Sequence, residues 1–173
     1  MFIDLLRKRR SIRQFQEKEV EQEKLELLIE AMLRAPSSRS LNPWEFVVVT
    51  EKETIKALAR SKPHGAAFVK NAPLVIVVCA DPEKCDVWIE DCSIASILLH
   101  LAATDLGLGS CWVQVRLRGH DGQQSAEAYV AGVLGLKEGL AVEAMIAIGY
   151  PGEEKKGHPP SSLLVDRVSY RKG

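Results

Sequence analysis

The segment PLVIVVCA, Pro73 to Ala80, constrains the fold most strongly because it is apolar at nearly every consecutive position. A run this rich in β-branched residues predicts a strand. A strand with two apolar faces lies inside a sheet, where other layers cover both sides. We therefore expect Pro73–Ala80 near the centre of a sheet.

A long helix is predicted soon after this strand, over residues 86–106. Its apolar side chains surround the helix almost completely and include Trp88, Ile89, Cys92, Ile94, Ile97, Leu98 and Leu101. A helix that is apolar all round is buried. The burial can occur at the centre of the domain or in a subunit interface, and the pattern leaves both open.

The remaining elements are predicted from periodicity and from turn residues. Helices are expected over residues 2–9, 21–35, 51–60 and 125–134, and strands over residues 44–50, 109–115 and 141–151. A polar tail begins at Gly152. Because neither an internal repeat nor a domain boundary is visible, the sequence predicts one α+β domain over residues 1–173, with a central sheet flanked by helices.

Composition excludes several classes of function. Lys and Arg total 23, as do Asp and Glu, so no overall field attracts nucleic acid or an anionic membrane. No apolar run approaches a membrane span, and the N-terminus lacks the charge order of a signal peptide. The four cysteines show neither zinc-site nor disulfide spacing. We therefore expect a cytoplasmic protein that binds neither nucleic acid nor membrane.

One local feature departs from this even charge balance. The stretch RKRRSIRQF places Arg9, Arg10 and Arg13 around Ser11. Guanidinium groups and a hydroxyl suit phosphate oxygens, but such runs are more often solvated charged faces. Read alone, the run favours the solvated face over an anion site.

Two further segments have both an ordinary and a functional interpretation. In APSSRSLNPW, the side chains of Ser37, Ser38, Ser40 and Asn42 could bind a planar heterocycle, although turn residues of this kind also build ordinary loops. In GLGSCWVQV, Gly107 or Gly109 can end the preceding helix, or the backbone after Trp112 can run beside a ligand ring. Alone, each segment favours the ordinary interpretation.

Titratable residues on the long helix also have ordinary interpretations. His100 lies on the apolar helix without a metal-ligand partner spacing, so we expect a hydrogen-bonded core residue. Asp86, Glu90 and Asp91 occupy its first turns, where acidic residues suit the helix dipole. Both observations have a structural explanation, so neither indicates a catalytic residue.

The order of these segments is more specific than any one of them. The sequence resembles the nitroreductase family of FMN-dependent flavoproteins, which includes the oxygen-insensitive nitroreductases. The resemblance is carried by RRSIRQF after a short helix, by APSSRSLNPWEFVVV, and by AATDLGLGSCWV followed by AIGYPGEEKK. Together these segments span nearly the whole chain.

The resemblance implies a nitroreductase-like fold with a mostly antiparallel sheet, and a homodimer that holds FMN in clefts between subunits. By position, Arg9, Arg10 and Ser11 would contact the FMN phosphate and neighbouring polar groups, and Arg13 would lie towards the ribityl chain or the pyrimidine edge. The opposite subunit would line the ring with Pro36, Ser37 and Ser38, in the loop that also holds Ser40 and Asn42. Gln114 and Val115 would place backbone groups against the central ring, and Lys156 is a further phosphate candidate.

The implied activity is an oxidoreductase that takes hydride from NADH or NADPH and reduces nitroaromatics, quinones or similar acceptors by a ping-pong mechanism. Because the flavin performs the chemistry, we expect no catalytic side chain. Two departures stand out: the family's Asn and Gln in the serine-rich loop are Ser40 and Asn42 here, and Gln114-Val115 replaces a more glycine-rich or acidic pair.

Three alternatives stay open at this point. One is a specialised member of the family, which fragments flavin, dehalogenates tyrosine or acts as a dehydrogenase on peptide-derived rings. Another is a flavin-binding carrier or sensor with little turnover. The last is a domain that has lost FMN.

Overall fold

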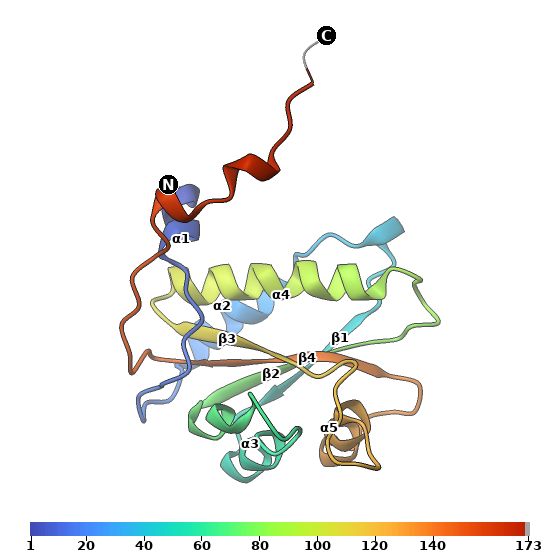
Figure 1. Cartoon of the computed structure of the whole chain (residues 1–173). Coiled ribbons are helices and arrows are strands. Elements are labelled where there is room, and N and C mark those ends of the chain that lie inside the picture. Colours follow the sequence, from blue (N-terminus) through green and yellow to red (C-terminus); the bar gives the residue numbers. More distant parts are fainter. Residues whose placement is uncertain (172–173) are drawn as a thin grey trace.

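A computed structural model describes residues 1–171 of the chain (Figure 1). The predicted helices and strands are all present, with ends that differ from the expected ones by a few residues. In chain order the elements are α1 (Phe2–Lys8), α2 (Gln22–Leu33), η1 (Ser38–Ser40), β1 (Trp44–Val49), α3 (Lys52–Leu58), η2 (Ala67–Asn71), β2 (Leu74–Ala80), α4 (Trp88–Asp105), β3 (Gly109–Gln114), α5 (Ala126–Leu134), β4 (Ala141–Gly149), η3 (Pro160–Ser162) and η4 (Val165–Arg167).

The four strands form one sheet in the order β1-β2-β4-β3. Each neighbouring pair is antiparallel, which confirms the expected sheet. Strand β2 is buried along its whole length and lies between two other strands, as its apolar sequence predicts. Between Val78 and Cys79 the register with β4 shifts, so that Val78 pairs with Ala144 and Cys79 pairs with Val142. Glu143 is therefore the additional residue of a β-bulge.

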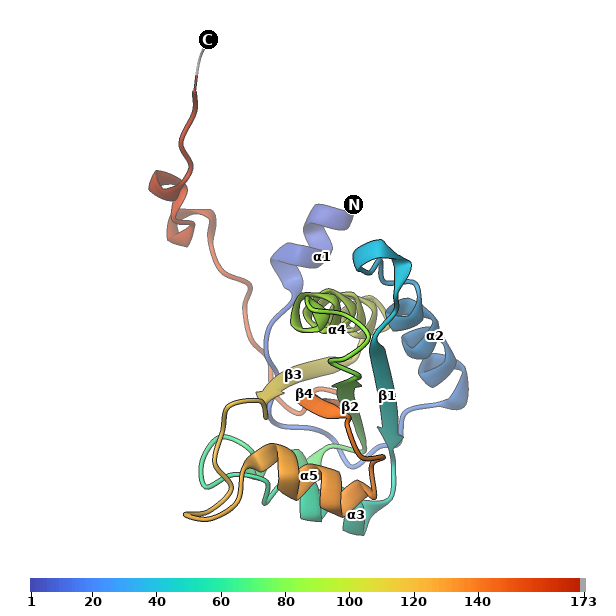
Figure 2. The same ribbon diagram turned by 90° about the vertical axis from the view of Figure 1, so that its right-hand side faces the viewer.

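Helices cover both faces of the sheet (Figures 1 and 2). Helices α2 and α4 lie on one face, where Leu28, Leu99 and Ile146 belong to one apolar cluster. Helices α3 and α5 lie on the other face, where Ile55 and Val130 belong to a second cluster. The two clusters meet at the strands, so the sheet lies at the centre of the molecule.

Helix α4 is buried on one side only. Its sheet-facing residues include Leu99, which is inaccessible to solvent, whereas Ile94 and Ile97 on the outer side are 39% and 43% exposed. Gly107 follows the helix with a φ of 75°, and Leu108 N–H donates to the Ala103 carbonyl at 2.7 Å. Gly107 is thus the glycine that ends α4.

The tail leaves the body of the protein after it passes α1 (Figures 1 and 2). At Gly157 the tail approaches the Arg7 carbonyl so closely that a Cβ atom would collide with it. Beyond this point the apolar side chains of Leu163, Leu164, Val165, Val168 and Tyr170 are exposed. In the part of the chain described here, no helix is long and apolar enough to cross a membrane.

Candidate functional site

The basic N-terminal segment forms a strap, residues 9–19, that begins along the free edge of β3. Ser11 and Ser110 form a parallel bridge, and Ile12 N–H donates to the Ser110 carbonyl at 3.0 Å. Ile12 is buried, and a Cβ atom on Gly109 would lie 2.8 Å from the Ile12 Cβ. The strap therefore depends on a glycine at position 109 for its close approach to the sheet.

Side chains from the tail hold this part of the strap. Lys155 Nζ donates to the Ser11 carbonyl at 3.0 Å and lies 3.0 Å from Glu153 Oε1. The same Glu153 oxygen accepts the Arg13 N–H at 2.6 Å, and this bond is the main reason that the pKa of Glu153 is lowered. Arg10 donates to the Lys156 carbonyl. The ammonium that reaches Ser11 thus belongs to Lys155, while Lys156 contributes its backbone and has an exposed side chain.

Arg13 marks the far end of this cationic segment. Its side chain is exposed, and its guanidinium carbon lies 5.8 Å from the centroid of the Phe68 ring.

Lys62, from the loop after α3, extends to β3 and donates to the Gln114 carbonyl at 2.8 Å. Partial burial, reinforced by repulsion from Arg118, lowers the pKa of Lys62. Sequence patterns do not predict this role for Lys62, because nothing local in SKPHG links it to β3.

The open edge of β3 connects these groups. In an antiparallel pair, the backbone groups of alternate residues point to the same side. Since the Ser110 carbonyl and the Gln114 carbonyl both point outward, Trp112 shares this orientation. From Ser110 to Gln114 the edge extends about 13 Å. This edge is an extended stretch of backbone with cationic side chains near both of its ends.

The predicted pair Gln114-Val115 divides between two directions. Val115 is buried, its N–H donates to the Glu143 carbonyl at 3.1 Å, and its carbonyl accepts the Arg118 N–H at 3.1 Å. Both backbone groups of Val115 are thus engaged within the chain. Gln114 is the member of the pair that faces the open edge.

The serine loop, residues 35–44, lies at the other side of the sheet and leads into β1. Ser37 Oγ donates to Asn42 Oδ1 at 2.6 Å and accepts the Asn42 N–H at 2.9 Å. Pro36 and Ser40 are exposed. Arg39, Ser40 and Asn42 have φ values of 53°, 54° and 47°, and strained backbone of this kind clusters at functional sites.

Asp91 holds the serine loop on α4. This buried carboxylate accepts the Ser38 N–H at 2.9 Å through Oδ1 and faces the Cys85 thiol through Oδ2, at 3.4 Å. Arg39 forms an ion pair with Asp86. Favourable placement near the helix dipole was therefore an incomplete account of these two acids, because both contact a loop that is distant in sequence.

The strap and the serine loop lie on opposite edges of the sheet. Figure 2 shows the strap beside β3 and the loop above β1, with α4 between them. Three strand spacings separate β1 from β3, or about 14 Å. One chain therefore brings Arg9, Arg10, Ser11, Arg13 and Gln114 to one edge, whereas Pro36, Ser37, Ser38, Ser40 and Asn42 lie at the other.

Near the strap's attachment, His100 is the hydrogen-bonded core residue that its sequence context predicts. Its Nδ1 lies 2.7 Å from Ser110 Oγ. Burial, with a smaller contribution from Arg9, lowers the pKa of His100 to about 4, so the ring is neutral at pH 7. The four cysteines are buried free thiols, and residues 1–171 contain no cluster of metal-ligating side chains.

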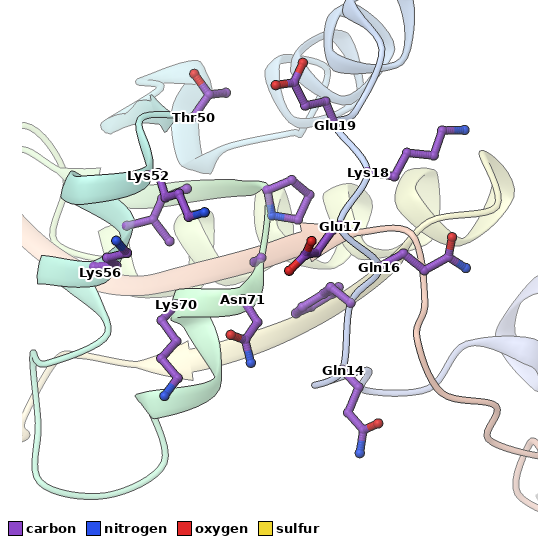
Figure 3. Close-up of a pocket in the computed structure, with 14 residues that line it drawn as sticks. Gln14, Gln16, Glu17, Lys18, Glu19, Thr50, Lys52, Lys56, Lys70 and Asn71 are labelled. Carbon is purple, nitrogen blue, oxygen red and sulfur yellow. The ribbon is translucent and has the colours of Figure 1, made fainter.

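A separate groove of about 850 Å³ lies between the later part of the strap and α3 (Figure 3). Lys52, Lys56 and Lys70 line one side, and Glu17 and Glu19 come from the strap. None of the predicted cofactor residues lines this groove. It is therefore distinct from the edge of β3.

Comparisons with known proteins agree with this architecture. The model of the nitroreductase family matches residues 6–62 and 55–150. A solved FMN-dependent nitroreductase from Clostridium difficile R20291 is 47% identical, with a TM-score of 0.96 and 99% of each chain covered. An NADH dehydrogenase of Thermus thermophilus is 32% identical over 200 residues, which cover 93% of this chain and 91% of the relative. A protein of Archaeoglobus fulgidus, provisionally named NADH dehydrogenase/NAD(P)H nitroreductase, is 36% identical over 151 residues, or 85% and 83% of the two chains.

Proposed function

The chain belongs to the nitroreductase family, and we propose that it is an FMN-dependent oxidoreductase. It takes hydride from NADH or NADPH and reduces an electron-poor acceptor, such as a nitroaromatic or a quinone, in a ping-pong cycle. The observation that carries this proposal is the open edge of β3, with cations near both of its ends. When bound there, the flavin supplies the hydride chemistry.

The residues along this edge fit the polar groups of FMN. Arg9, Arg10 and Ser11 would bind the phosphate dianion, because forked guanidinium donors match its oxygens. Lys155 is a stronger candidate than Lys156 for the contribution of the tail, since its ammonium already lies at Ser11. Gln114 would present its backbone N–H towards the central ring. Arg13 and Lys62 would place positive charge near the pyrimidine edge, where it favours reduction.

The serine loop would complete the site from a second copy of the chain. Within one chain, the loop and the strap lie at opposite edges of the sheet, so a ring held at β3 needs the partner's loop to cover it. The exposed outer side of α4, with Ile94 and Ile97, supplies an apolar surface for association. The apolar residues of the tail, beyond Gly157, would contact the partner as well. We therefore propose a homodimer with FMN between the subunits.

The absorbance spectrum tests the cofactor and the donor together. The purified protein is given FMN, freed of excess, and then mixed with NADH or NADPH without oxygen. Retained flavin bands that one donor bleaches, followed by recovery with a quinone, are the expected result. Retained bands that neither donor bleaches would indicate a carrier or a specialised flavoenzyme, and a protein without retained flavin would contradict the proposal.

The state of the cysteines bears on where the protein works. All four cysteines are free, buried thiols, which suits a reducing compartment. We propose that the enzyme works in the cytoplasm, where NADH and NADPH are available.

A further inference from the structure

Glu143 is a buried carboxyl group with an unusual set of contacts. It occupies the β-bulge of β4 and is 2% exposed. Its Oε1 accepts a hydrogen bond from Ser93 Oγ at 2.7 Å. Its Oε2 finds no hydrogen-bonding partner among residues 1–171. An ionised carboxylate is costly to leave in this state, because burial removes its water without full replacement.

Burial favours the neutral form of Glu143 over its charged form. Burial raises the pKa of Glu143 to about 7, and Glu90 on α4 adds to the increase, while the Ser93 hydrogen bond and the positive charge of Arg116 oppose it. Cys92, also on α4, is a thiol whose own pKa is raised by burial and by Glu143. The positive charge of Arg116 thus does not compensate for burial, and the raised pKa of this carboxyl group lies near neutral pH.

The backbone of Glu143 is bonded to the two residues that follow Gln114 of the proposed site. Its backbone carbonyl accepts the N–H groups of Val115 and Arg116, at 3.1 and 2.9 Å. These residues follow Gln114 at the end of the open edge of β3. The backbone of Glu143 therefore lies next to the strand end that would contact the flavin ring, and its carboxyl group extends from there to Ser93 on α4.

Ser93 links this carboxyl group to the surface. The residue lies on the exposed side of α4, next to the exposed Ile94, and two positions after Asp91, which holds the serine loop. A serine hydroxyl can accept one proton while it donates another, and it rotates to do so. Within the described chain, the Ser93 hydroxyl is the only group that bonds to the Glu143 carboxyl group. It connects Oε1 to the outer side of α4.

The reaction under the proposed function consumes a proton. In the net reduction of a quinone, NADH, one proton and the quinone give NAD⁺ and the hydroquinone. Hydride carries both electrons and one hydrogen, so the second hydrogen must arrive as a proton. No other buried carboxyl group of the described chain has a free oxygen beside β3.

We propose that Glu143 and Ser93 form the proton store of the flavin site. Glu143 gives its proton to the Ser93 hydroxyl, which releases its own proton towards the site, and the resulting carboxylate regains a proton from water in each turnover. Glu143 is a positioning residue for this proton and does not contact the acceptor. The inference rests on the proposed function for the destination of the proton, but the proton-binding group itself can be tested without it.

Infrared spectroscopy tests the proton-binding group. In the FMN-loaded protein, we expect a carbonyl band of a protonated carboxylic acid at pH 6 that disappears with a midpoint near pH 7. Glu143→Gln should remove the band, and Ser93→Ala should shift its frequency because a hydrogen bond is lost. Ser96→Ala is the matched control, since Ser96 Oγ bonds to the Cys92 carbonyl at 2.8 Å and not to Glu143. Absence of the band at pH 6 would overturn the proposal.

Rapid mixing tests the transfer. The reduced enzyme is mixed with a quinone, and we expect the oxidation rate to fall up to about tenfold per pH unit above pH 7. Ser93→Ala should slow this step and weaken its dependence on pH, and Ser93→Thr should restore both. Hydride uptake from the donor should stay at the wild-type rate.

Two results separate this inference from the proposed function. A wild-type pH profile and rate in both Glu143→Gln and Ser93→Ala would overturn the proton store, even with the band present. If Glu143→Gln does not fold, the two Ser93 variants decide the question in the same way. Wild-type protein that retains no flavin would refute the proposed function, and the infrared titration of that protein would still decide whether Glu143 binds a proton.

Discussion

Replacing Gly109 with alanine tests whether the strap is held against β3 as described. The added Cβ atom would lie 2.8 Å from the Cβ and Cγ2 of Ile12 and 2.9 Å from its Cγ1. Ile12 is buried and its N–H is bonded to Ser110, so the strap cannot yield without breaking that bridge. Overpacking of this kind costs about 1–3 kcal/mol, which corresponds to a fall in Tm of roughly 2–12 °C for a chain of this size.

Thermal unfolding and an FMN titration measure the two consequences. We expect Gly109→Ala to lower Tm and also to weaken FMN binding, because Ser11 and the neighbouring arginines move with the strap. Gly132→Ala is the control, since this exposed glycine lies within α5 and a Cβ atom there meets nothing within 4 Å. It should gain about 0.5–1 kcal/mol. If Gly109→Ala matched this control in Tm and in FMN affinity, the described attachment of the strap would be wrong.

Three further predictions concern single side chains. Lys62→Met should weaken FMN binding by about tenfold or more, because a hydrogen bond from a charged group contributes about 1.5–3 kcal/mol; Lys70→Met, in the separate groove, should leave the FMN dissociation constant unchanged. Asp91→Ala leaves the Ser38 N–H without its partner and should cost about 1–3 kcal/mol of unfolding free energy, as urea denaturation would show; an unchanged midpoint would argue against this anchor. Glu143 has a folded pKa of about 7, above its ordinary 4.5, so the folded state binds more protons and stability falls as the pH rises from about 4.5 to about 7. Relative to Glu143→Gln, the wild type should lose on the order of 3 kcal/mol over this window, whereas parallel stability profiles would contradict the shifted pKa.

The local sequence pattern was sufficient to predict the α-helices and the strands. The consecutive apolar residues of Pro73–Ala80 predicted an inner strand, and β2 is inner because β1 and β4 cover its two edges. Helix α4 was predicted to be buried, at the centre of the domain or in a subunit interface, and within one chain it is buried on its sheet side with Ile94 and Ile97 exposed. The apolar residues on its outer side are therefore not covered within a single chain.

Side-chain roles depended on contacts that the sequence does not encode locally. Val115 and Gln114 differ in direction because β3 pairs with β4, which is distant in sequence, and that pairing decides which residues face the open edge. Lys62 reaches Gln114 from another loop, and it is Lys155 rather than Lys156 whose ammonium lies at Ser11. The role of Asp91 required knowledge that the serine loop folds back onto α4.

The most direct test of the central claim is to combine two defective chains in one dimer. One chain carries Arg10→Glu and Arg13→Glu in the strap, and the other carries Ser37→Arg in the serine loop. Each homodimer should retain little FMN, whereas the purified heterodimer should bind one FMN, because the intact strap and the intact loop meet in one of its two symmetry-related sites. A heterodimer that binds no flavin, or a serine-loop homodimer that binds FMN as the wild type does, would contradict a site built from two chains.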